Sequence, residues 1–153
     1  IHRPMARDQR VAYIAENPSQ MMLFQDMSYL RNLTFCLPRQ IDSWLRRRSI
    51  YRSLRRELTP ELGAVFDKDI RDLNAQEKYA LIFRRVLLQQ PRVVFFEQPF
   101  WGNDVLLQQH IERQVQLLLD KKIAVVVLIV GIYDAFPLAE RTLIYKNGHL
   151  LTQ

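Results

Sequence analysis

Two short apolar runs in the second half of the chain predict buried β-strands. Val93–Phe96 lies between Pro91 and Pro99, and residues 123–130 form a second apolar run. Runs that are apolar at every position are typical of parallel strands buried on both faces. Residues 104–121 lie between the two runs and carry apolar side chains at a spacing of three to four, which predicts a helix. This order of elements indicates an α/β domain with a parallel sheet.

Capping residues predict where helices begin. Asn74, with Glu77 three positions later, has the arrangement of a capping box and predicts a helix over residues 75–90. Thr59 followed by Pro60 predicts the start of another helix, which runs toward Asp69. Further helices are predicted over 28–35, from Asp42 or Ser43 to Leu58, and over 134–140, and further strands over 11–15, 142–146 and 149–152, with an Asn147-Gly148 hairpin turn before the last. The helix at 134–140 and the strand at 142–146 continue the α/β alternation.

Length and composition indicate one compact globular domain. The chain has 153 residues, too few for two domains, and its 48% hydrophobic content is ordinary for a globular protein. The longest apolar run, residues 123–133, falls well short of the roughly 20 residues of a membrane-spanning helix. The single Cys36 excludes an internal disulfide, fits a reducing compartment and is expected to be a small buried residue. The start at Ile1 shows no apolar signal segment and no initiator Met, so we expect a fragment or a processed chain.

The positive charge is concentrated in one segment. The formal net charge is +6, and between residues 39 and 56 only Asp42 opposes seven arginines: Arg39, Arg46, Arg47, Arg48, Arg52, Arg55 and Arg56. Such a segment suits nucleic acid, anionic lipid headgroups or an acidic partner, although a solvated helix face is the ordinary explanation. No aromatic residues are interleaved at a spacing suited to base stacking, so the pattern does not favour nucleic acid.

Polar residues follow both predicted buried strands. Glu97 and Gln98 come after the first strand and Gly131 after the second, at the sheet edge where α/β proteins place their sites. Glu97 could hold a magnesium ion and Gln98 a water; alternatively, Glu97 only ends the strand and pairs with an arginine. The glycines form no GxxxxGK[ST] phosphate loop, and the three histidines show no metal-ligand spacing, with His110 expected at the surface.

The order and spacing of these segments resemble the later part of an ABC transporter ATPase domain. Leu73–Lys78 is similar to the LSGGQ signature, and it is followed without a gap by a helix similar to the family's ARALL segment. Val93–Pro99 resembles the Walker B strand, and Asp104 stands at the D-loop aspartate. Val11–Glu16 is similar to the Q-loop strand, and residues 134–148 to the segment after the switch histidine.

This resemblance implies a P-loop NTPase-like fold, a parallel sheet flanked by helices, without its Walker A portion. Residues 1–153 would form a single partial domain, with a helical subdomain at about 21–72 and the signature, Walker B and switch part of the core at 73–153. The Walker A loop is expected before Ile1. Two narrower resemblances are present: Val11–Glu16 with Met27-Ser28 is similar to the second ATPase half of tandem monosaccharide importers, and Pro99–Asp104 to lipid-transport ATPases.

Several family residues are replaced. The resemblance places Asn74, Ala75, Gln76 and Glu77 at the signature, Asp104 in the D-loop, Glu16 at the Q-loop glutamine, Glu97 at the metal-binding Walker B aspartate, Gln98 at the catalytic glutamate and Gly131 at the switch histidine. A neutral amide such as that of Gln98 orients water but cannot take its proton. Binding of ATP and magnesium is therefore expected to be weak or lost.

Taken together, the replacements indicate a degenerate ATP-binding-cassette subunit at the cytoplasmic face of the membrane. It would act structurally or as a regulator, and would pair with a competent ATPase and a membrane permease. One alternative is an active ATPase whose P-loop lies upstream and which powers import of a small solute. Another is a nucleic-acid-binding ABC-like protein outside transport, which the residues favour least. Whether the protein is an enzyme stays open at this point.

Overall fold

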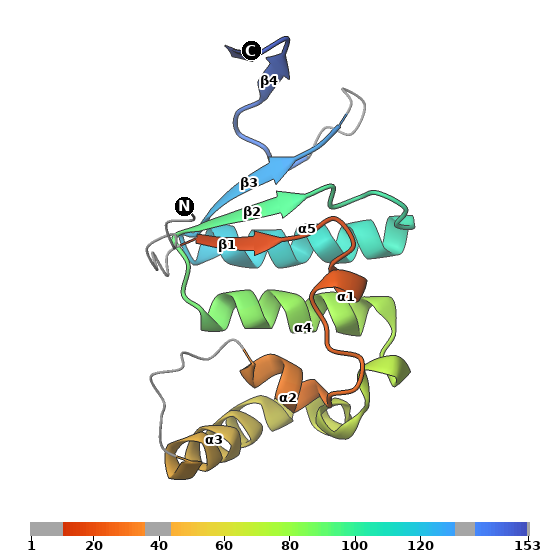
Figure 1. Ribbon diagram of the computed structural model, residues 1–153, viewed down its shortest axis with the longest axis vertical. Helices are drawn as coiled ribbons and strands as arrows, with labels where there is room; N and C mark the ends of the chain where they lie inside the picture. The colour runs from red at the N-terminus through yellow and green to blue at the C-terminus, as the bar shows by residue number, and fades with distance from the viewer. Residues whose placement is uncertain (1–10, 36–43, 131–136, 153) are drawn as a thin grey trace, which may run out of the picture.

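A three-stranded parallel sheet forms one layer of the molecule (Figure 1). The structure is a computed structural model and describes residues 11–35, 44–130 and 137–152. The strands are β1 (Val11–Ile14), β2 (Val93–Glu97) and β3 (Ala124–Leu128), hydrogen-bonded in that order. Val11 pairs with Val93, which pairs with Ala124, and all neighbours are parallel. The predicted parallel sheet is therefore confirmed.

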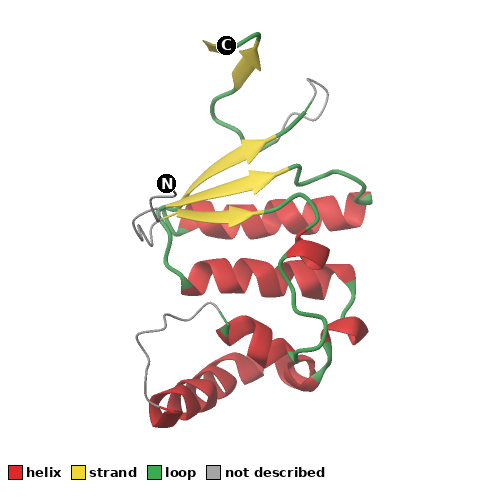
Figure 2. Cartoon of the chain, viewed as in Figure 1, coloured by secondary structure: helices red, strands yellow, loops and turns green. Residues whose placement is uncertain are grey.

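The helices lie on one side of this sheet (Figure 2). Two of them, α4 (Ala75–Leu88) and α5 (Val105–Asp120), pack near the strands, and α2 and α3 lie beyond α4 (Figure 1). The other helical segments are α1 (Pro18–Met21), α2 (Tyr29–Thr34), α3 (Trp44–Leu62) and two 3₁₀ turns, η1 (Gly63–Asp67) and η2 (Ile70–Asp72). Ser28 caps α2, as its predicted start requires, because its hydroxyl accepts a hydrogen bond from the Arg31 N–H.

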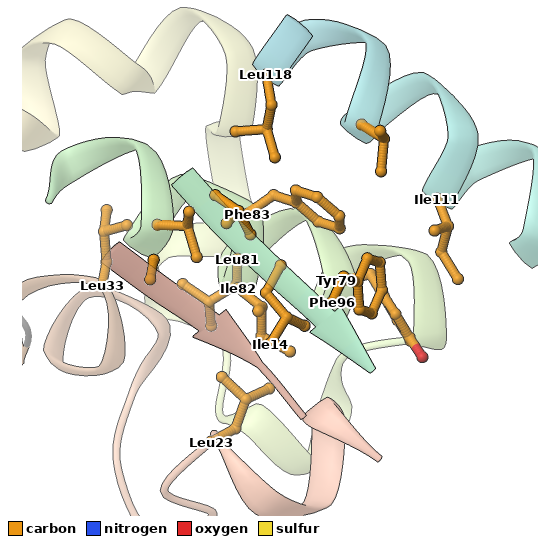
Figure 3. Close-up of a cluster of buried hydrophobic side chains, with 14 of the residues drawn as sticks. Ile14, Leu23, Leu33, Tyr79, Leu81, Ile82, Phe83, Phe96, Ile111 and Leu118 are labelled. Atoms are coloured by element: carbon orange, nitrogen blue, oxygen red, sulfur yellow. The ribbon is translucent and has the colours of Figure 1, made fainter. Parts of the chain in front are cut away.

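The hydrophobic core fills the space between the sheet and the helices (Figure 3). Every second strand residue points into it, including Ile14 and Phe96, which are fully buried. The Phe96 ring meets Phe83 of α4 edge to face, with ring centroids 5.8 Å apart. Ile111 and Leu118 of α5 complete this side of the core. These contacts fix the sheet against α4 and α5.

The opposite face of the sheet is open to solvent, contrary to the expectation that the strands are buried on both faces. Val11 is 52% exposed, Tyr13 49% and Val126 39%, and Phe95 between them in β2 is half-buried. In Figure 2 no described helix lies over this face. Apart from Glu97 at the end of β2, the residues of the three strands are apolar or aromatic, but the described chain covers only one side of the sheet.

The prediction of a helix start at Pro60 is wrong. The helix α3 continues through Pro60 and ends at Leu62, where Gly63 with φ +47° begins a 3₁₀ turn. The Thr59 hydroxyl donates back to the Arg55 carbonyl within the same helix, so it caps no new one. Near the end of a helix a proline removes a single backbone hydrogen bond, which the helix tolerates here.

The C-terminal strands form a hairpin of their own and do not extend the parallel sheet. β4 (Leu143–Lys146) pairs antiparallel with β5 (His149–Thr152), which confirms the predicted hairpin. Asn147 and Gly148 have φ values of 51° and 84°, as a type I′ turn requires. The structure describes residues 137–140 of the predicted helix at 134–140, and these form turns and bends. Gly131, Cys36 and residues 134–136 lie outside the described residues.

Candidate functional site

The carboxyl ends of β1 and β2 bring three of the expected site residues to one edge of the sheet. Ile14 pairs with Phe96, so Glu16, two residues beyond β1, and Gln98 follow neighbouring strands at equivalent positions. Glu97 is the last residue of β2 and pairs with Leu128 of β3. The helices α4 and α5 also begin on this side of the molecule (Figure 1). This is the edge at which open α/β sheets bind ligands.

Glu97 is held by a neighbouring side chain that the sequence pattern did not single out. The Tyr13 hydroxyl donates a hydrogen bond to Glu97 Oε2 across the open face of the sheet. This bond to the carboxylate, with lesser contributions from desolvation and from the charges of Glu97 and Glu16, raises the pKa of Tyr13. Among the described residues the hydrogen-bond partner of Glu97 is Tyr13, and none of the ion pairs described there joins Glu97 to an arginine. Only the strand register reveals this pair, because Tyr13 faces Phe95, two residues before Glu97.

Gln98 begins a tight turn in an uncommon backbone conformation. Its φ is +46°, which few residues other than glycine adopt. The Gln98 N–H donates to the Leu128 carbonyl at 2.8 Å, and its own carbonyl accepts from the Trp101 N–H at 3.2 Å. Gln98 is thus fixed between the ends of β2 and β3. Its neutral amide could orient a water molecule, but it provides no base to deprotonate that water.

These residues alone do not make a magnesium site. The described part of the chain contains no group of three or more His, Cys, Asp or Glu side chains close enough to hold a metal ion. Glu97 supplies one carboxylate, and Tyr13 already donates to it. In nucleotide sites magnesium is usually bound by one or two carboxylates, and waters and phosphates complete its near-octahedral shell, so Glu97 would need such further ligands to hold the ion.

The residues at the signature position close the start of α4 upon itself. Asn74 Oδ1 accepts from the Glu77 N–H at 2.8 Å, and Glu77 Oε2 accepts from the Asn74 N–H at 2.9 Å. This confirms the predicted capping box. Lys68 Nζ lies 3.1 Å from Glu77 Oε1. Ala75 and Gln76, between the two capping residues, are exposed.

The Glu77 carboxylate remains charged in this arrangement. Burial acts to raise the pKa of Glu77, but the hydrogen bond from the Asn74 backbone and the interactions with Lys68 outweigh it and lower the pKa. A negative charge therefore sits in the first turn of α4, where the helix dipole stabilises it. Two of the N–H donors at this end of the helix, those of Asn74 and Glu77, are bonded within the chain, and the Glu77 carboxylate opposes the positive field that would attract a phosphate.

Asp104 caps α5, and the preceding turn is tied to α4. Asp104 Oδ1 accepts from the Leu107 N–H at 2.8 Å. The Asn103 amide donates to the Tyr79 hydroxyl at 3.2 Å and to the Pro99 carbonyl at 2.9 Å. Burial raises the pKa of Tyr79, and the hydrogen bond from Asn103 partly opposes this. Asn103 and Tyr79 thus position the turn between β2 and α5, a role that no sequence motif indicated.

Two groups of expected site residues remain separate. No described hydrogen bond or ion pair joins the signature residues 74–77 to Glu97 or Gln98, although both groups lie on the side where α4 and α5 begin. Gly131, at the switch position, is outside the described residues. Within the described residues the expected site residues therefore fall into two separate groups, here called half-sites, one at the ends of β1 and β2 and one at the start of α4.

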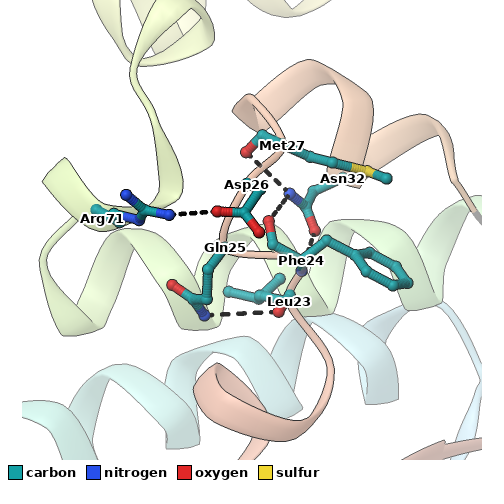
Figure 4. A network of polar contacts seen from close by, with 7 residues as sticks. All are labelled: Leu23, Phe24, Gln25, Asp26, Met27, Asn32 and Arg71. Atoms are coloured by element: carbon teal, nitrogen blue, oxygen red, sulfur yellow. Dashed lines mark hydrogen bonds and ion pairs between the residues drawn. The ribbon is translucent and has the colours of Figure 1, made fainter.

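Beyond Glu16, a buried asparagine organises the segment that follows the edge of the sheet (Figure 4). Asn32 is fully buried; its Oδ1 accepts from the Phe24 N–H at 2.8 Å, and its Nδ2 donates to the Phe24 carbonyl at 2.9 Å. The same Nδ2 reaches the carbonyls of Met27 and Ser28, each at 3.3 Å. These contacts hold residues 24–28 in one conformation against α2.

Two arginines connect this segment to the rest of the fold. Arg71 forms an ion pair with Asp26, as drawn in Figure 4. Arg85, buried in α4, donates through Nη1 to the Met22 carbonyl. The segment is therefore linked both to the turn before the signature and to the helix that the signature begins.

His110 lies against the start of α4 and gives a pH prediction. The side chain is half-buried rather than at the surface. Desolvation, and to a lesser extent the charge of Arg113, lowers the pKa of His110, whereas hydrogen bonding to the Gln76 backbone acts to raise it. The unfolded chain then takes up a proton before the folded one. We expect the free energy of unfolding to fall as pH drops from about 6.5, the unfolded value, through the lowered folded pKa.

Urea unfolding of the wild type and of His110→Gln checks this prediction. The measurements run from about pH 5 to about pH 8, a range that lies on both sides of the unfolded histidine pKa. The variant should lose the part of the pH dependence that lies below about 6.5. Identical pH profiles for the two proteins would contradict the assignment.

Among the helices that the structure describes, none is both long enough and apolar enough to span a bilayer.

Comparison with known proteins finds relatives in one functional class. No protein-family profile matches the chain. It is 26% identical over 142 residues to the lipopolysaccharide export system ATP-binding protein LptB of Acidithiobacillus ferridurans, covering 93% of this chain and 57% of that protein. It is 26% identical over 86 residues to the spermidine/putrescine import ATP-binding protein PotA of Mesoplasma florum, covering 55% of this chain and 24% of that protein.

A solved structure shows the same fold. The chain superposes on cbiO1 from Clostridium perfringens, described as part of the ABC transporter complex cbiONQ, with a TM-score of 0.69 and 17% identity. The match covers 94% of this chain and 56% of that one, so the chain spans a little over half the length of cbiO1 and of LptB. The expected ABC ATPase fold is confirmed. None of the three relatives is named as a monosaccharide importer, and that narrower resemblance stays an expectation.

Proposed function

Because this chain is an ABC transporter ATPase-type domain, we propose that it is a degenerate one, with a structural or regulatory role beside a competent ATPase and a membrane permease. LptB and PotA are named as ATP-binding proteins of an export and an import system, and the proposal extends that setting to this chain. It includes a location at the cytoplasmic face of the membrane and weak or absent binding of ATP and magnesium.

The self-closed start of α4 carries the proposal. In the family that this chain resembles, the signature contacts the phosphate of an ATP held by the opposing domain. Here the Glu77 carboxylate occupies the first turn, bonded to Asn74 and Lys68. An incoming phosphate would meet a like charge and would have to displace bonds already made.

The edge of the sheet supports the same proposal. Gln98 stands at the position of the catalytic base and cannot accept a proton. Glu97, at the Walker B position, accepts a hydrogen bond from Tyr13, and Glu16 brings a second negative charge nearby. Two independent parts of the nucleotide machinery therefore depart from what hydrolysis requires.

The open face of the sheet supports a role inside a larger assembly. Val11, Tyr13, Val126 and Leu128 are exposed on it, and the half-buried Phe95 lies among them. Exposed apolar surface of this kind is unfavourable in an isolated soluble domain. We therefore include in the proposal that polypeptide outside these 153 residues, from the same protein or a partner, covers this face.

Nucleotide binding and turnover by the whole natural protein test the proposal. The protein is assayed alone and together with the ATPase and permease encoded by its genomic neighbours, with a Gln98→Glu variant as the matched control. We expect no saturable ATP binding and no turnover by the wild type alone, assembly with the neighbours, and turnover only in the assembly. Turnover by the wild type alone at an ordinary transporter rate would contradict the proposal.

An active ATPase is the second candidate, and one observation favours it. Glu97 keeps a carboxylate at the end of β2, where the family binds magnesium, and the sheet brings Glu16 and Gln98 to the same edge. A P-loop upstream of Ile1 would then complete the site and power import of a small solute. Turnover that is abolished by Glu97→Gln would support this candidate.

A further inference from the structure

The outer helix α3 carries a basic face that the proposed function does not use. Arg48, Arg52 and Arg55 follow one another at spacings of four and three residues, and Arg56 is four residues after Arg52. Such spacings place side chains on one side of a helix. All four arginines are exposed, whereas Tyr51 and other apolar residues on the inward side are half-buried.

This basic face is only partly neutralised. Over its whole length α3 contains six arginines and two glutamates. Arg55 pairs with Asp67, with Nη2 2.8 Å from Oδ2. Within the described residues neither Arg52 nor Arg56 has an ion-pair or hydrogen-bond partner. Successive helical residues are about 100° apart, so the exposed Glu57 points away from the Arg52 and Arg56 side.

The position of α3 leaves this face accessible. The helix lies at the end of the molecule opposite the sheet, and α4 lies between them (Figure 1). Arg52 and Arg56 therefore take no part in either half-site. The basic face thus lies on the helix farthest from the sheet, away from both half-sites.

An exposed aromatic pair lies beside the same helix. The Thr34 hydroxyl donates to the Tyr51 hydroxyl at 2.7 Å, which joins the end of α2 to the middle of α3. The next residue, Phe35, is 56% exposed and packs against Phe24, with ring centroids 4.3 Å apart. This exposed aromatic pair thus directly follows the point at which α2 contacts α3.

We propose that α3 binds the anionic phospholipid surface of a membrane, with Arg52 and Arg56 contacting headgroup phosphates and the Phe24–Phe35 pair contacting the interface. Guanidinium groups bind phosphate through paired hydrogen bonds. Exposed aromatic rings at the junction of α2 and α3 suit the boundary between headgroups and acyl chains, and would gain nothing from a purely ionic partner. A nucleic-acid partner fits less well, because Tyr51, within the basic segment, is half-buried and bonded to Thr34.

Vesicle co-sedimentation of the purified natural protein tests this proposal. Vesicles of phosphatidylcholine alone are compared with vesicles that also contain phosphatidylglycerol, at low and at high salt. We expect binding to the anionic vesicles only, weakened by salt. The double variant Arg52→Gln/Arg56→Gln should lower the partition coefficient about 30-fold, because each arginine near the surface contributes about fivefold.

A matched control removes two charges elsewhere. Lys121 and Lys122 are exposed in the turn between α5 and β3, away from α3, and Lys121→Gln/Lys122→Gln should change the partition coefficient by less than about threefold. Phe35→Ser provides a second variant, expected to weaken binding several-fold with all charges kept. Circular dichroism verifies that each variant is folded.

Several outcomes would overturn the proposal. One is equal binding of the wild type to neutral and anionic vesicles. A second is equal loss of binding in the arginine and lysine variants, which would indicate net charge alone. A third is displacement of the protein from vesicles by millimolar soluble glycerol phosphate, which would indicate a site for free phosphate. Tighter binding to duplex DNA or to an acidic peptide than to anionic vesicles would assign the basic face to those partners.

Discussion

Replacing Phe96 by alanine is expected to lower the free energy of unfolding by about 3–5 kcal/mol. The Phe96 ring is fully buried between the sheet and the helices and packs edge to face on Phe83. Truncation removes the buried ring and leaves a cavity that α4 and α5, fixed to the sheet by the surrounding contacts, cannot fully close. Urea unfolding of the natural protein, followed by circular dichroism, measures the change.

Phe95→Ala is the matched control, because it removes the same ring from the adjacent position on the opposite face of the sheet. Phe95 is half-buried in the described chain. In the isolated 153-residue chain, Phe95→Ala should therefore lower the free energy of unfolding by less than half as much as Phe96→Ala. In the full assembly its cost should rise, if other polypeptide covers the open face as proposed. Equal costs for both variants in the isolated chain would contradict the one-sided packing of the sheet.

Replacing Asn32 by alanine is expected to destabilise the protein by about 2–4 kcal/mol. The substitution leaves the Phe24 N–H and the Phe24 carbonyl without the partners that now lie at 2.8 Å and 2.9 Å. It also removes the donor to the Met27 and Ser28 carbonyls. Buried backbone groups that lose their partners are costly, because water does not replace them.

Two further variants refine this prediction. Asn32→Asp keeps an acceptor for Phe24 but loses the donors and buries a charge, so it should destabilise at least as much as alanine. Gln25→Ala is the control, because Gln25 is exposed and donates only to nearby carbonyls. This substitution should change the free energy of unfolding by no more than about 0.5 kcal/mol. Urea unfolding and limited proteolysis at residues 24–28 measure these effects. A wild-type proteolysis rate for Asn32→Ala would show that Asn32 does not hold the segment.

The Asn32 prediction also bears on function. In the family that this chain resembles, the region after the Q-loop faces the permease. Under the proposed function, an ordered segment 24–28 presents a fixed surface to that partner. Asn32→Ala should then weaken assembly with the permease more than Gln25→Ala does, even at temperatures where both variants remain folded.

Under the proposed function, bonds within each half-site account for the loss of ATP hydrolysis. At the start of α4, the Asn74 and Glu77 N–H groups and the Lys68 ammonium group are already bonded to side chains of the capping box. At the end of β2, the Glu97 carboxylate is bonded to Tyr13. Restoring Gln98 to glutamate alone therefore leaves both of these arrangements in place, and we expect it to be insufficient for turnover.

Elements with local signals could be predicted from the amino-acid sequence. The cap formed by Asn74 and Glu77 depends on residues three positions apart, and the Asn147-Gly148 turn on two adjacent residues, so both could be predicted without knowing the fold. The apolar runs that became β1, β2 and β3 were also readable from the chain. Their order and spacing, together with the motifs around them, were enough to indicate the ABC ATPase fold.

The tertiary structure alone decided which faces and side chains meet. The strand register places Tyr13 beside Glu97, 84 positions apart in the chain, and no pattern along the chain encodes that distance. Pro60 has the sequence context of a helix start, yet α3 continues through it to Leu62. An apolar run shows that a strand can be buried on both faces, but only the arrangement of α4 and α5 shows that one face is covered here. Local signals fix dihedral angles and caps over a few residues, whereas burial, register and partners depend on segments that the chain brings together only when it folds.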